Sequence, residues 1–456
     1  MVPTYCLLLN FKQFEAGTKR YKNPVTMNHV SRVFLYKNSD VIFFTECVGQ
    51  KLRVKLTRNS IPQISKRKEV ADIMKIAMFG HKHIFTNEGG IEVVVSELVK
   101  RMAKNNIIIV YERNELDKPR CETYVPEEIK ENIEIKYSPT ISSTTVNAQM
   151  SSFFSTMGCV FGRQDIVHVH AEGQCVFLPL LKLAGKKVVV TIHGIDWMRA
   201  KWGKFAKWYI HLGEKMAVRY ANEIIVLSPE MKEYFKKEYN RETKLIRNGV
   251  SIRINNEYTK IIKYGIYPNR YILYIGRFAP EKRIDLLYEA FEKMKNKENI
   301  KLVLAGLEDD AVKERDWYKK AKQNTSVIFV GHIGGAFKDQ LITNCSAFVL
   351  PSDIEGMSIS LLEGLGYGCQ VIASDIHENR HIMSSYGVVF KKGDSDDLAE
   401  KLDEAVSKKH EPDKDQIEFI RENYDWDHVT EETLDLYYSV ISGCDKSESF
   451  GDPAGV

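Results

Sequence analysis

The chain has 456 residues, of which 44% are hydrophobic and 28% are charged. At about 150 residues per domain this length corresponds to about three folding units, and it can bury more than one core. The composition is that of an ordinary globular protein and excludes a disordered, collagen-like or membrane-embedded chain.

Positive charge is concentrated in the N-terminal segment. Residues 1–73 contain 13 Lys and Arg against 5 Asp and Glu, a net charge of +8, so the remainder carries −4 within the overall +4. A slightly acidic body offers no continuous basic face to a phosphate backbone, and we therefore expect no nucleic-acid partner.

The sequence carries no evident targeting or metal-binding signal. The eight cysteines form no C-x-x-C pair and no Cys/His cluster at zinc spacing, so we expect reduced thiols and no metal or other cofactor. The first residues lack the charged region and cleavage site of a signal peptide, and no uncharged stretch reaches the roughly 18 residues that span a bilayer. These features predict a cytoplasmic protein.

Residues 1–73 form a basic N-terminal extension. Apolar and polar residues alternate over 32–36, 41–44 and 51–56, which favours short antiparallel strands or an irregular extension.

At Met74 the pattern changes to strands that alternate with helices. A compact apolar strand at 75–79 ends in Gly80, and a helical pattern follows from Gly90 to Lys104. Further strands are predicted at 107–111, 134–137, 165–170, 187–192 and 223–227, and helices at 173–184, 201–220 and 230–238. This alternation predicts one lobe over 74–250, a parallel sheet with helices on both faces.

A second series of the same kind occupies residues 251–425. Its strands are predicted at 271–276, 300–305, 327–330, 347–350, 371–374 and 387–390, and its helices at 281–295, 310–323, 335–344, 357–367 and 394–407. A closing helix and a frayed tail are expected over 426–456. The predicted fold class is thus α/β, with two doubly wound Rossmann-like lobes that face each other across a cleft.

A distinctive segment follows the first strand of each lobe: glycines in the first lobe and cationic side chains in the second. Neither carries G-x-G-x-x-G, which argues against a dinucleotide oxidoreductase. In the first lobe Gly89 and Gly90 open a helix, a place where backbone N–H groups accept an anion or where glycine merely allows a tight turn. In the second lobe Arg277 and Lys282 follow the strand at its carboxyl end, so two cations face the crevice and suit a diphosphate.

Two glutamates follow a later strand of the second lobe. Glu355 lies at a strand end and Glu363 lies eight positions later, just over two helical turns, so both carboxylates are predicted to address one face. The helix N-terminus between them offers backbone donors at Gly356, Met357 and Ser358.

The motif GRFAPEK at 276–282, together with the E-x7-E pair, resembles the signature of the retaining nucleotide-sugar glycosyltransferases of family 4, which have the GT-B fold. The resemblance spans about residues 74–440. Segments 74–80, 88–92, 193–197 and 201–208 are similar to a bacterial subgroup that includes rhamnosyltransferases of surface-polysaccharide synthesis.

The resemblance implies a role for each site residue. Arg277 and Lys282 would bind the donor diphosphate, and Glu363 would hold the ribose. Glu355 would face the transferred sugar, and His193 of the first lobe would reach the reacting centre. The remaining donor contacts would come from Gly90, Gly356, Met357 and Ser358. Met357 and Ser358 replace the commoner Phe-Gly, which keeps the backbone donors and leaves the sugar open.

Other polar residues have simpler interpretations. His168 and His170 alternate with valines on a buried strand and are expected to be structural, with lining of the acceptor cleft as the alternative. Asp394 in D-S-D-D precedes a helix and is predicted to be an N-cap rather than a metal ligand. Glu355, Glu363, Arg277 and Lys282 could instead be solvated surface residues or ion-pair partners.

These features predict a metal-independent enzyme. Cations and a helix N-terminus can stabilise a departing nucleoside diphosphate, and no carboxylate is placed to attack the anomeric carbon, so the resemblance implies front-face displacement with retention. The predicted activity is transfer of a hexosyl or deoxyhexosyl group from a nucleotide sugar to a glycan or polyprenyl-diphosphate-linked acceptor. The alternatives are an epimerase or phosphorylase on the same architecture, or a non-catalytic nucleotide-sugar-binding protein.

A basic aromatic stretch runs from Trp197 to Arg219. Its six cations against Glu214 give a net charge of +5, and five aromatic residues are interleaved: Trp197, Trp202, Phe205, Trp208 and Tyr209. Such a helix suits the anionic inner face of the plasma membrane, although a helix packed on its own lobe uses the same residues.

Overall fold

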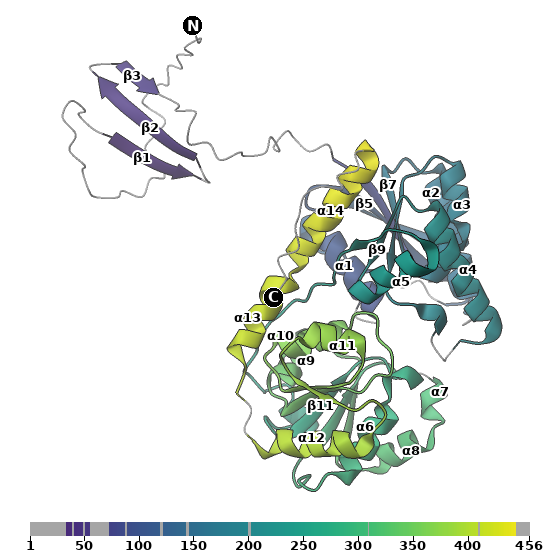
Figure 1. Ribbon diagram of the computed structural model, residues 1–456, viewed down its shortest axis with the longest axis vertical. Helices are drawn as coiled ribbons and strands as arrows, with labels where there is room; N and C mark the ends of the chain where they lie inside the picture. The colour runs from purple at the N-terminus through teal and green to yellow at the C-terminus, as the bar shows by residue number, and fades with distance from the viewer. Residues whose placement is uncertain are drawn as a thin grey trace. The chain divides into compact units, whose positions relative to one another are not determined.

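The computed structural model describes residues 33–38, 41–48, 51–54, 73–86, 89–118, 122–142, 146–198, 202–308, 310–408 and 411–443. The chain divides into two units, Met1–Asp72 and Ile73–Val456. In the first unit, β1 (Val33–Asn38), β2 (Val41–Val48) and β3 (Lys51–Val54) pair antiparallel in that order (Figure 1). The antiparallel strands expected here are therefore present.

The second unit begins with a lobe built on a seven-stranded parallel sheet of order β10-β9-β8-β7-β4-β5-β6. The strands are β4 (Lys75–Phe79), β5 (Ile107–Glu115), β6 (Ile133–Thr140), β7 (Ile166–His170), β8 (Val188–Ile192), β9 (Glu223–Val226) and β10 (Lys244–Leu245). The strand order reverses between β4 and β7, which is where doubly wound sheets open a crevice for ligands.

Helices cover both faces of this sheet because neighbouring strand residues point to opposite sides. Ile76 packs in one core cluster with Val95 of α1, whereas Phe79 packs in another with Cys159 of α2. The helices are α1 (Gly90–Met102), α2 (Asn147–Phe161), α3 (Leu178–Leu183), α4 (Lys204–Tyr220) and α5 (Pro229–Tyr239). The sequence analysis did not identify α2.

The second lobe has a six-stranded parallel sheet of order β13-β12-β11-β14-β15-β16. The strands are β11 (Tyr271–Ile275), β12 (Lys301–Ala305), β13 (Val327–Gly331), β14 (Ala347–Leu350), β15 (Val371–Ser374) and β16 (Val388–Phe390). Here the order reverses between β11 and β14. Both sheets are thus doubly wound, as predicted.

The helices of this lobe also lie on both faces of their sheet. They are α6 (Ile284–Lys293), α7 (Asp310–Lys313), α8 (Asp316–Gln323), α9 (Gly335–Thr343), α10 (Ile359–Gly366), α11 (His377–Met383), α12 (Ser395–Ser407) and α13 (Lys414–Asn423). The Asp394 carboxylate accepts from the backbone N–H groups of Asp396 and Asp397 and caps α12, which confirms that prediction.

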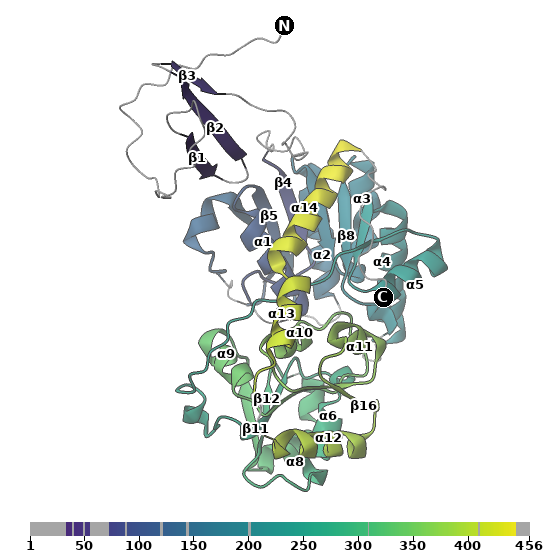
Figure 2. The same ribbon diagram turned by 60° about the vertical axis from the view of Figure 1, so that its left-hand side comes forward.

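The final helix, α14 (Trp426–Ser442), returns to the first lobe. Trp426 and Tyr437 are fully buried in the cluster that contains Ile76 and α1, and both views show α14 beside that helix (Figures 1 and 2). The chain therefore crosses between the lobes twice, once near Val250 and once between α13 and α14. The first lobe is completed by the last helix of the described chain.

Candidate functional site

The predicted donor residues gather where the strand order of the second lobe reverses. Arg277 and Lys282 follow β11, and Glu355 follows β14, its neighbour in the sheet. Because parallel strands end at one edge, the two loops meet there. The Lys282 ammonium lies 2.6 and 2.7 Å from the two carboxylate oxygens of Glu355.

The Lys282–Glu355 pair is largely buried. The side chains are 18% and 7% exposed, and both carboxylate oxygens accept from the same ammonium. Removing either partner would leave a charge in a poorly hydrated place, which is costly. The pair is therefore a fixed charge arrangement rather than a loose surface contact.

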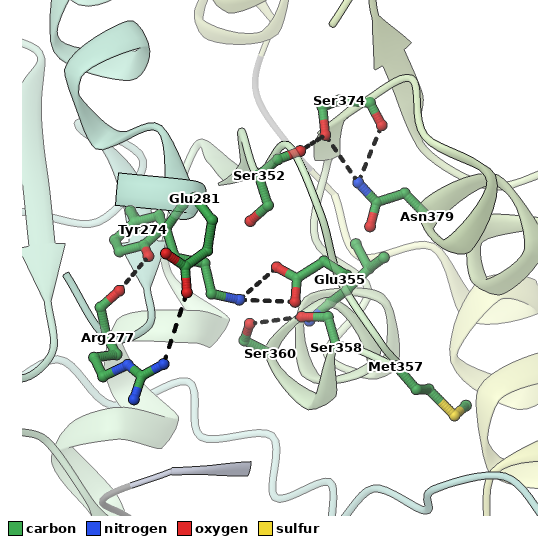
Figure 3. Close-up of polar contacts among 12 residues, drawn as sticks. Tyr274, Arg277, Glu281, Ser352, Glu355, Met357, Ser358, Ser360, Ser374 and Asn379 are labelled. Carbon is green, nitrogen blue, oxygen red and sulfur yellow. Dashed lines mark hydrogen bonds and ion pairs between the residues drawn. The ribbon is translucent and has the colours of Figure 1, made fainter. Parts of the chain in front are cut away.

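The loop that carries Glu355 is held by neighbouring polar groups (Figure 3). The Ser374 hydroxyl donates to the Ser352 carbonyl, and the Asn379 amide donates to the Ser374 carbonyl at 3.0 Å. The Asp353 N–H donates to the Glu281 carbonyl at 2.8 Å. These bonds tie the loop to β15, to α11 and to the segment that bears Lys282, so the two charged residues are positioned together.

The helix N-terminus lies between the two glutamates, as predicted, but the helical-turn argument for a shared face fails because Glu355 is not on the helix. The helix α10 begins at Ile359, and Ser358 is its N-cap, its hydroxyl accepting from the Leu361 N–H at 3.3 Å. Glu355 thus lies in the preceding loop, because the N-cap interaction starts the helix at Ile359, four residues after Glu355. Only Glu363 is on the helix.

Glu363 pairs with a lysine that the sequence analysis missed. Its carboxylate accepts from the ammonium of Lys338 on α9, and the two side chains are 11% and 19% exposed. Lys338 stands near the start of a helix that follows β13, so its position after a strand of the same sheet was a usable signal.

Gly356 lies against the other lobe. A Cβ atom built on this glycine would be 1.8 Å from the carbonyl oxygen of His193, so only glycine fits here. The next residue, Met357, turns away from Glu355 (Figure 3), and its sulfur accepts from the Asn248 N–H at 3.1 Å. This segment therefore packs on the first lobe and brings Glu355 and His193 to the same interlobe region.

His193 belongs to a row of histidines at the carboxyl edge of the first sheet. Its Nε2 lies 3.1 Å from Nδ1 of His170, and the His170 ring lies 4.1 Å from that of His168. His168 is fully buried, with Nε2 2.7 Å from the Thr191 hydroxyl and Nδ1 2.5 Å from the Tyr437 hydroxyl of α14. His168 thus has the structural role expected, and His170 contacts the candidate reacting residue.

Burial keeps the imidazoles of His168 and His170 neutral. It lowers the pKa of His168 to about 3 and holds the pKa of His170 well below its usual value, with nearby histidines adding to the shift. Neutral rings accept and donate hydrogen bonds, which suits contact with hydroxyl groups more than with phosphate.

The other two predicted donor residues are more accessible. The Arg277 side chain is 45% exposed and lies 3.9 Å from the Glu281 carboxylate, so its guanidinium remains open to a ligand. Gly90 begins α1, and a Cβ atom there would meet no described atom within 4 Å, so a ligand could approach this glycine closely. Glu88 of the neighbouring motif is outside the described residues.

The aromatic residues of the basic stretch divide into two groups. Phe205 and Trp208 of α4 are 65% and 60% exposed, with ring centroids 5.7 Å apart. By contrast, the Trp197 indole N–H donates to the buried carboxylate of Glu214 at 3.2 Å. Only part of the stretch is packed on its own lobe. Arg199 and Lys201 lie outside the described residues.

The described residues contain neither a membrane-spanning helix nor a cluster of metal-ligating side chains. Among their helices, none combines the length and apolar character needed to cross a bilayer. No group of three or more His, Cys, Asp or Glu side chains in this part of the chain is arranged to hold a metal ion.

The described lobes match two family models. Residues 88–253 match the model described as Glycosyltransferase Family 4, and residues 259–423 match the model described as Glycosyl transferases group 1. The fold is also that of sucrose-phosphate synthase from Thermosynechococcus elongatus, with a TM-score of 0.65, 16% identity and coverage of 81% of this chain and 100% of that one. Anabaena HepE in complex with UDP and glucose gives a TM-score of 0.62 at 15% identity, covering 80% and 100%.

Curated relatives agree with this class. An uncharacterised glycosyltransferase of Methanocaldococcus jannaschii is 25% identical over 50% of this chain and 63% of its own length. The alpha-maltose-1-phosphate synthase of Mycolicibacterium smegmatis is 23% identical over 80% and 100%. A Campylobacter jejuni N-acetylgalactosaminyltransferase, named for a diacetylbacillosaminyl-diphospho-undecaprenol acceptor, is 24% identical over 41% and 52%.

The chain therefore has the GT-B fold, as predicted, and each of its two lobes matches a glycosyltransferase family model. It spans 63% of the length of the first of these relatives.

Proposed function

We propose that this protein is a retaining glycosyltransferase that moves a sugar from a nucleotide-diphosphate donor to a glycan or lipid-linked acceptor. The observation that carries the proposal is the fixed Lys282–Glu355 pair beside Arg277, at the strand reversal of one lobe and in the interlobe region that contains His193. A cation and a carboxylate held together can address the two halves of one substrate, its diphosphate and its sugar.

Each proposed role follows from the chemistry of the group. Arg277 and Lys282 neutralise the charge that develops on the leaving diphosphate, so no metal is required. Glu363 accepts from the ribose hydroxyls after Lys338 turns toward phosphate or solvent. Glu355 orients the transferred sugar, and His193 bonds to a hydroxyl near the reacting carbon.

The backbone around the start of α10 completes the donor site in this proposal. Gly356, Met357 and Ser358 present N–H groups toward the diphosphate, and Gly90 does the same from the first lobe. The nucleotide-sugar donor is supported by the similarity of the fold to that of HepE, which was solved in complex with UDP and glucose.

The acceptor is proposed to bind on the first lobe. A pocket of about 420 Å³ there is lined by aromatic residues and a few charged groups, among them Trp197, His211, Tyr234 and Tyr239. Apolar faces with a few polar groups suit a sugar ring. A polyprenyl-diphosphate-linked sugar of surface-polysaccharide synthesis, as in the rhamnosyltransferase-like subgroup, is the acceptor we favour.

A donor panel tests the proposed activity. Nucleotide sugars are offered with and without candidate acceptors, and release of free nucleoside diphosphate is measured together with the anomeric configuration of the product. We expect acceptor-dependent release, a retained configuration and no effect of a chelator. Acceptor-independent conversion of the donor would indicate an epimerase, and donor binding without turnover would indicate a binding protein.

The exposed side of α4 supports a second part of the proposal, association with the anionic inner membrane face. Lys204, Lys215 and Arg219 are exposed near the Phe205–Trp208 pair, so rings and cations are available together.

Sedimentation with anionic liposomes tests the membrane contact. We expect binding at low salt that weakens at high salt, because screening weakens charge contacts with lipid. Phe205→Ala/Trp208→Ala should abolish it, whereas Phe161→Ala, a change at a 79% exposed phenylalanine on α2, should not. Equal binding by both variants would exclude α4 as the contact.

A further inference from the structure

A basic pocket lies away from the site described above, beside both interlobe crossings. It has a volume of about 320 Å³. Four cationic side chains and two carboxylates line it, a net charge of +2: Lys100, Arg101, Arg253, Arg421, Glu97 and Asp425. Pockets of this size hold small molecules, and arginines at their walls favour phosphate groups.

The cations differ in how far they are already satisfied. Arg101 is held by Glu97 and by Asp427, the latter at 2.5 Å, so it is fixed and locally neutralised. The Arg421 side chain is 53% exposed, and its guanidinium lies 4.0 Å from the Glu418 carboxylate, which is a long contact for an ion pair. Lys100 and Arg253 are exposed and form no ion pair with any other described residue. Three cations thus remain available to an anion.

The pocket walls come from both lobes. Lys100 belongs to α1 of the first lobe, and Arg421 belongs to α13 of the second. The two segments that cross between the lobes are joined to each other, because the Val250 N–H donates to the Tyr424 carbonyl at 2.8 Å. Figure 2 shows α13 and α14 following one another beside α1 at this place. A molecule in the pocket would contact both lobes and both crossings at once.

We propose that this pocket binds a small phosphate monoester and that the bound molecule stabilises the lobe arrangement seen here. In this lobe arrangement Gly356 contacts the first lobe, so the same arrangement brings the two halves of the candidate site together. A ligand that binds one arrangement better than others shifts the population toward it. The phosphate ester and the nucleotide sugar should therefore strengthen each other's binding, a statement that rests on the proposed function.

Binding itself is tested without any donor. Glucose 6-phosphate serves as the probe in calorimetry with the full chain, and glucose is the uncharged control. We expect binding that persists in the donor-site variant Arg277→Gln, which removes the exposed donor cation and leaves the buried Lys282–Glu355 pair intact. It should weaken at least tenfold in Lys100→Gln/Arg253→Gln/Arg421→Gln, because three charge-assisted contacts are lost.

A matched control removes the same charge elsewhere. Arg163, Lys187 and Arg270 are exposed and do not line the pocket, and their triple Gln variant should bind the probe like the unmodified chain. Because all six side chains are exposed, both triple variants should fold, which equal melting temperatures would verify. Loss of binding in the donor-site variant, or unchanged binding in the pocket variant, would overturn the proposal.

Hydrogen exchange tests the effect on the crossings. The probe should slow exchange of the Val250 amide at least fivefold, and the pocket variant should show no such change, since the hydrogen bond to Tyr424 opens when the crossings separate. Unchanged exchange with the probe bound would refute the stabilising role.

Coupling between the two sites is measured as the Kd for the donor with and without the probe, where we expect the donor Kd to decrease about fivefold or more when the probe is bound. Probe binding without transferase activity would contradict the proposed function alone.

Discussion

The two lobes share one topology and differ in what stands where their strand order reverses. In the second lobe the loops after β11 and β14 hold Lys282 against Glu355, with Arg277 open to solvent. In the first lobe the corresponding edge, after β4 and β7, holds histidines buried at His168 and His170. The fold determines where a ligand can lie, and the residues at that edge determine what kind of ligand it is.

The difference is one of charge and hydration. In the second lobe, lysine ammonium groups and glutamate carboxylates are paired within hydrogen-bond distance. The imidazoles of the first lobe have lowered pKa values because burial disfavours their charged forms. One edge therefore suits phosphate and the other suits hydroxyl groups, which is what the proposed transfer from a diphosphate donor to a sugar acceptor would require.

The charged edge is tested most strongly at Lys282. Lys282→Ala should lower kcat by about 10²–10³-fold, because a contact to the departing diphosphate strengthens in the transition state. It should also lower the melting temperature, since Glu355 is left buried without its counter-ion. Lys282→Ala/Glu355→Ala should recover the melting temperature but not the rate. Wild-type turnover in the single variant would remove Lys282 from the mechanism.

The contact between the two edges is tested at Gly356. Gly356→Ala places a methyl group on the His193 carbonyl, so the lobes must separate, and we expect kcat/KM to fall by about 10–100-fold, the size expected of a misplacement of about 1 Å. Gly203→Ala is the matched control, because a Cβ atom there meets nothing within 4 Å. If both variants were equally active, close approach at Gly356 would not matter for turnover.

The two glutamates separate binding from reaction. Glu363→Gln should raise the donor KM by about tenfold with little change in kcat, because it removes one charged hydrogen bond to a group distant from the reacting carbon. Glu355→Gln should lower kcat instead. The measurement is steady-state kinetics over donor concentration, and identical effects of the two variants on KM alone would show that Glu355 does not orient the sugar.

The buried histidines at the sheet edge of the first lobe are tested by the pH dependence of the free energy of unfolding. Burial lowers the pKa of His168 to about 3 and that of His81, a buried histidine that follows β4, to about 4, so unfolding takes up protons below pH 6.5. Stability should therefore be fully present above that pH and decline as the pH falls from 6.5 toward 4. His168→Gln should reduce the slope by about 1.4 kcal/mol per pH unit, measured by urea unfolding.

Local patterns were enough to predict most of the fold. Alternating strands and helices indicated both sheets, because a parallel strand buried on two faces is a short apolar run, as at Val188–Ile192. The helix α2 was missed because serine and threonine residues interrupt its apolar pattern. Four of these serines and threonines are buried, so they occupy positions where an apolar residue would have indicated a helix.

The site was predicted in its residue types and not in its contacts. Lys282 and Glu355 were placed at strand ends by their motifs, but their pairing depends on which strands are neighbours, and sequence spacing does not contain that. The contact of Gly356 with His193 is of the same kind, since it joins residues of different lobes. The same holds for Lys338 with Glu363.

The hydrogen bond between Tyr437 and His168 joins residues 269 positions apart in the chain. Because α14 supplies Trp426 and Tyr437 to the core of the first lobe, that lobe remains unfinished on the ribosome until almost the entire described chain has been synthesised. The apolar face around Ile76 and Val95 is uncovered during this time, and a fragment ending at Val250 would keep it uncovered. Expression of the first lobe alone thus requires α14 to be supplied, as a fusion or as a separate peptide.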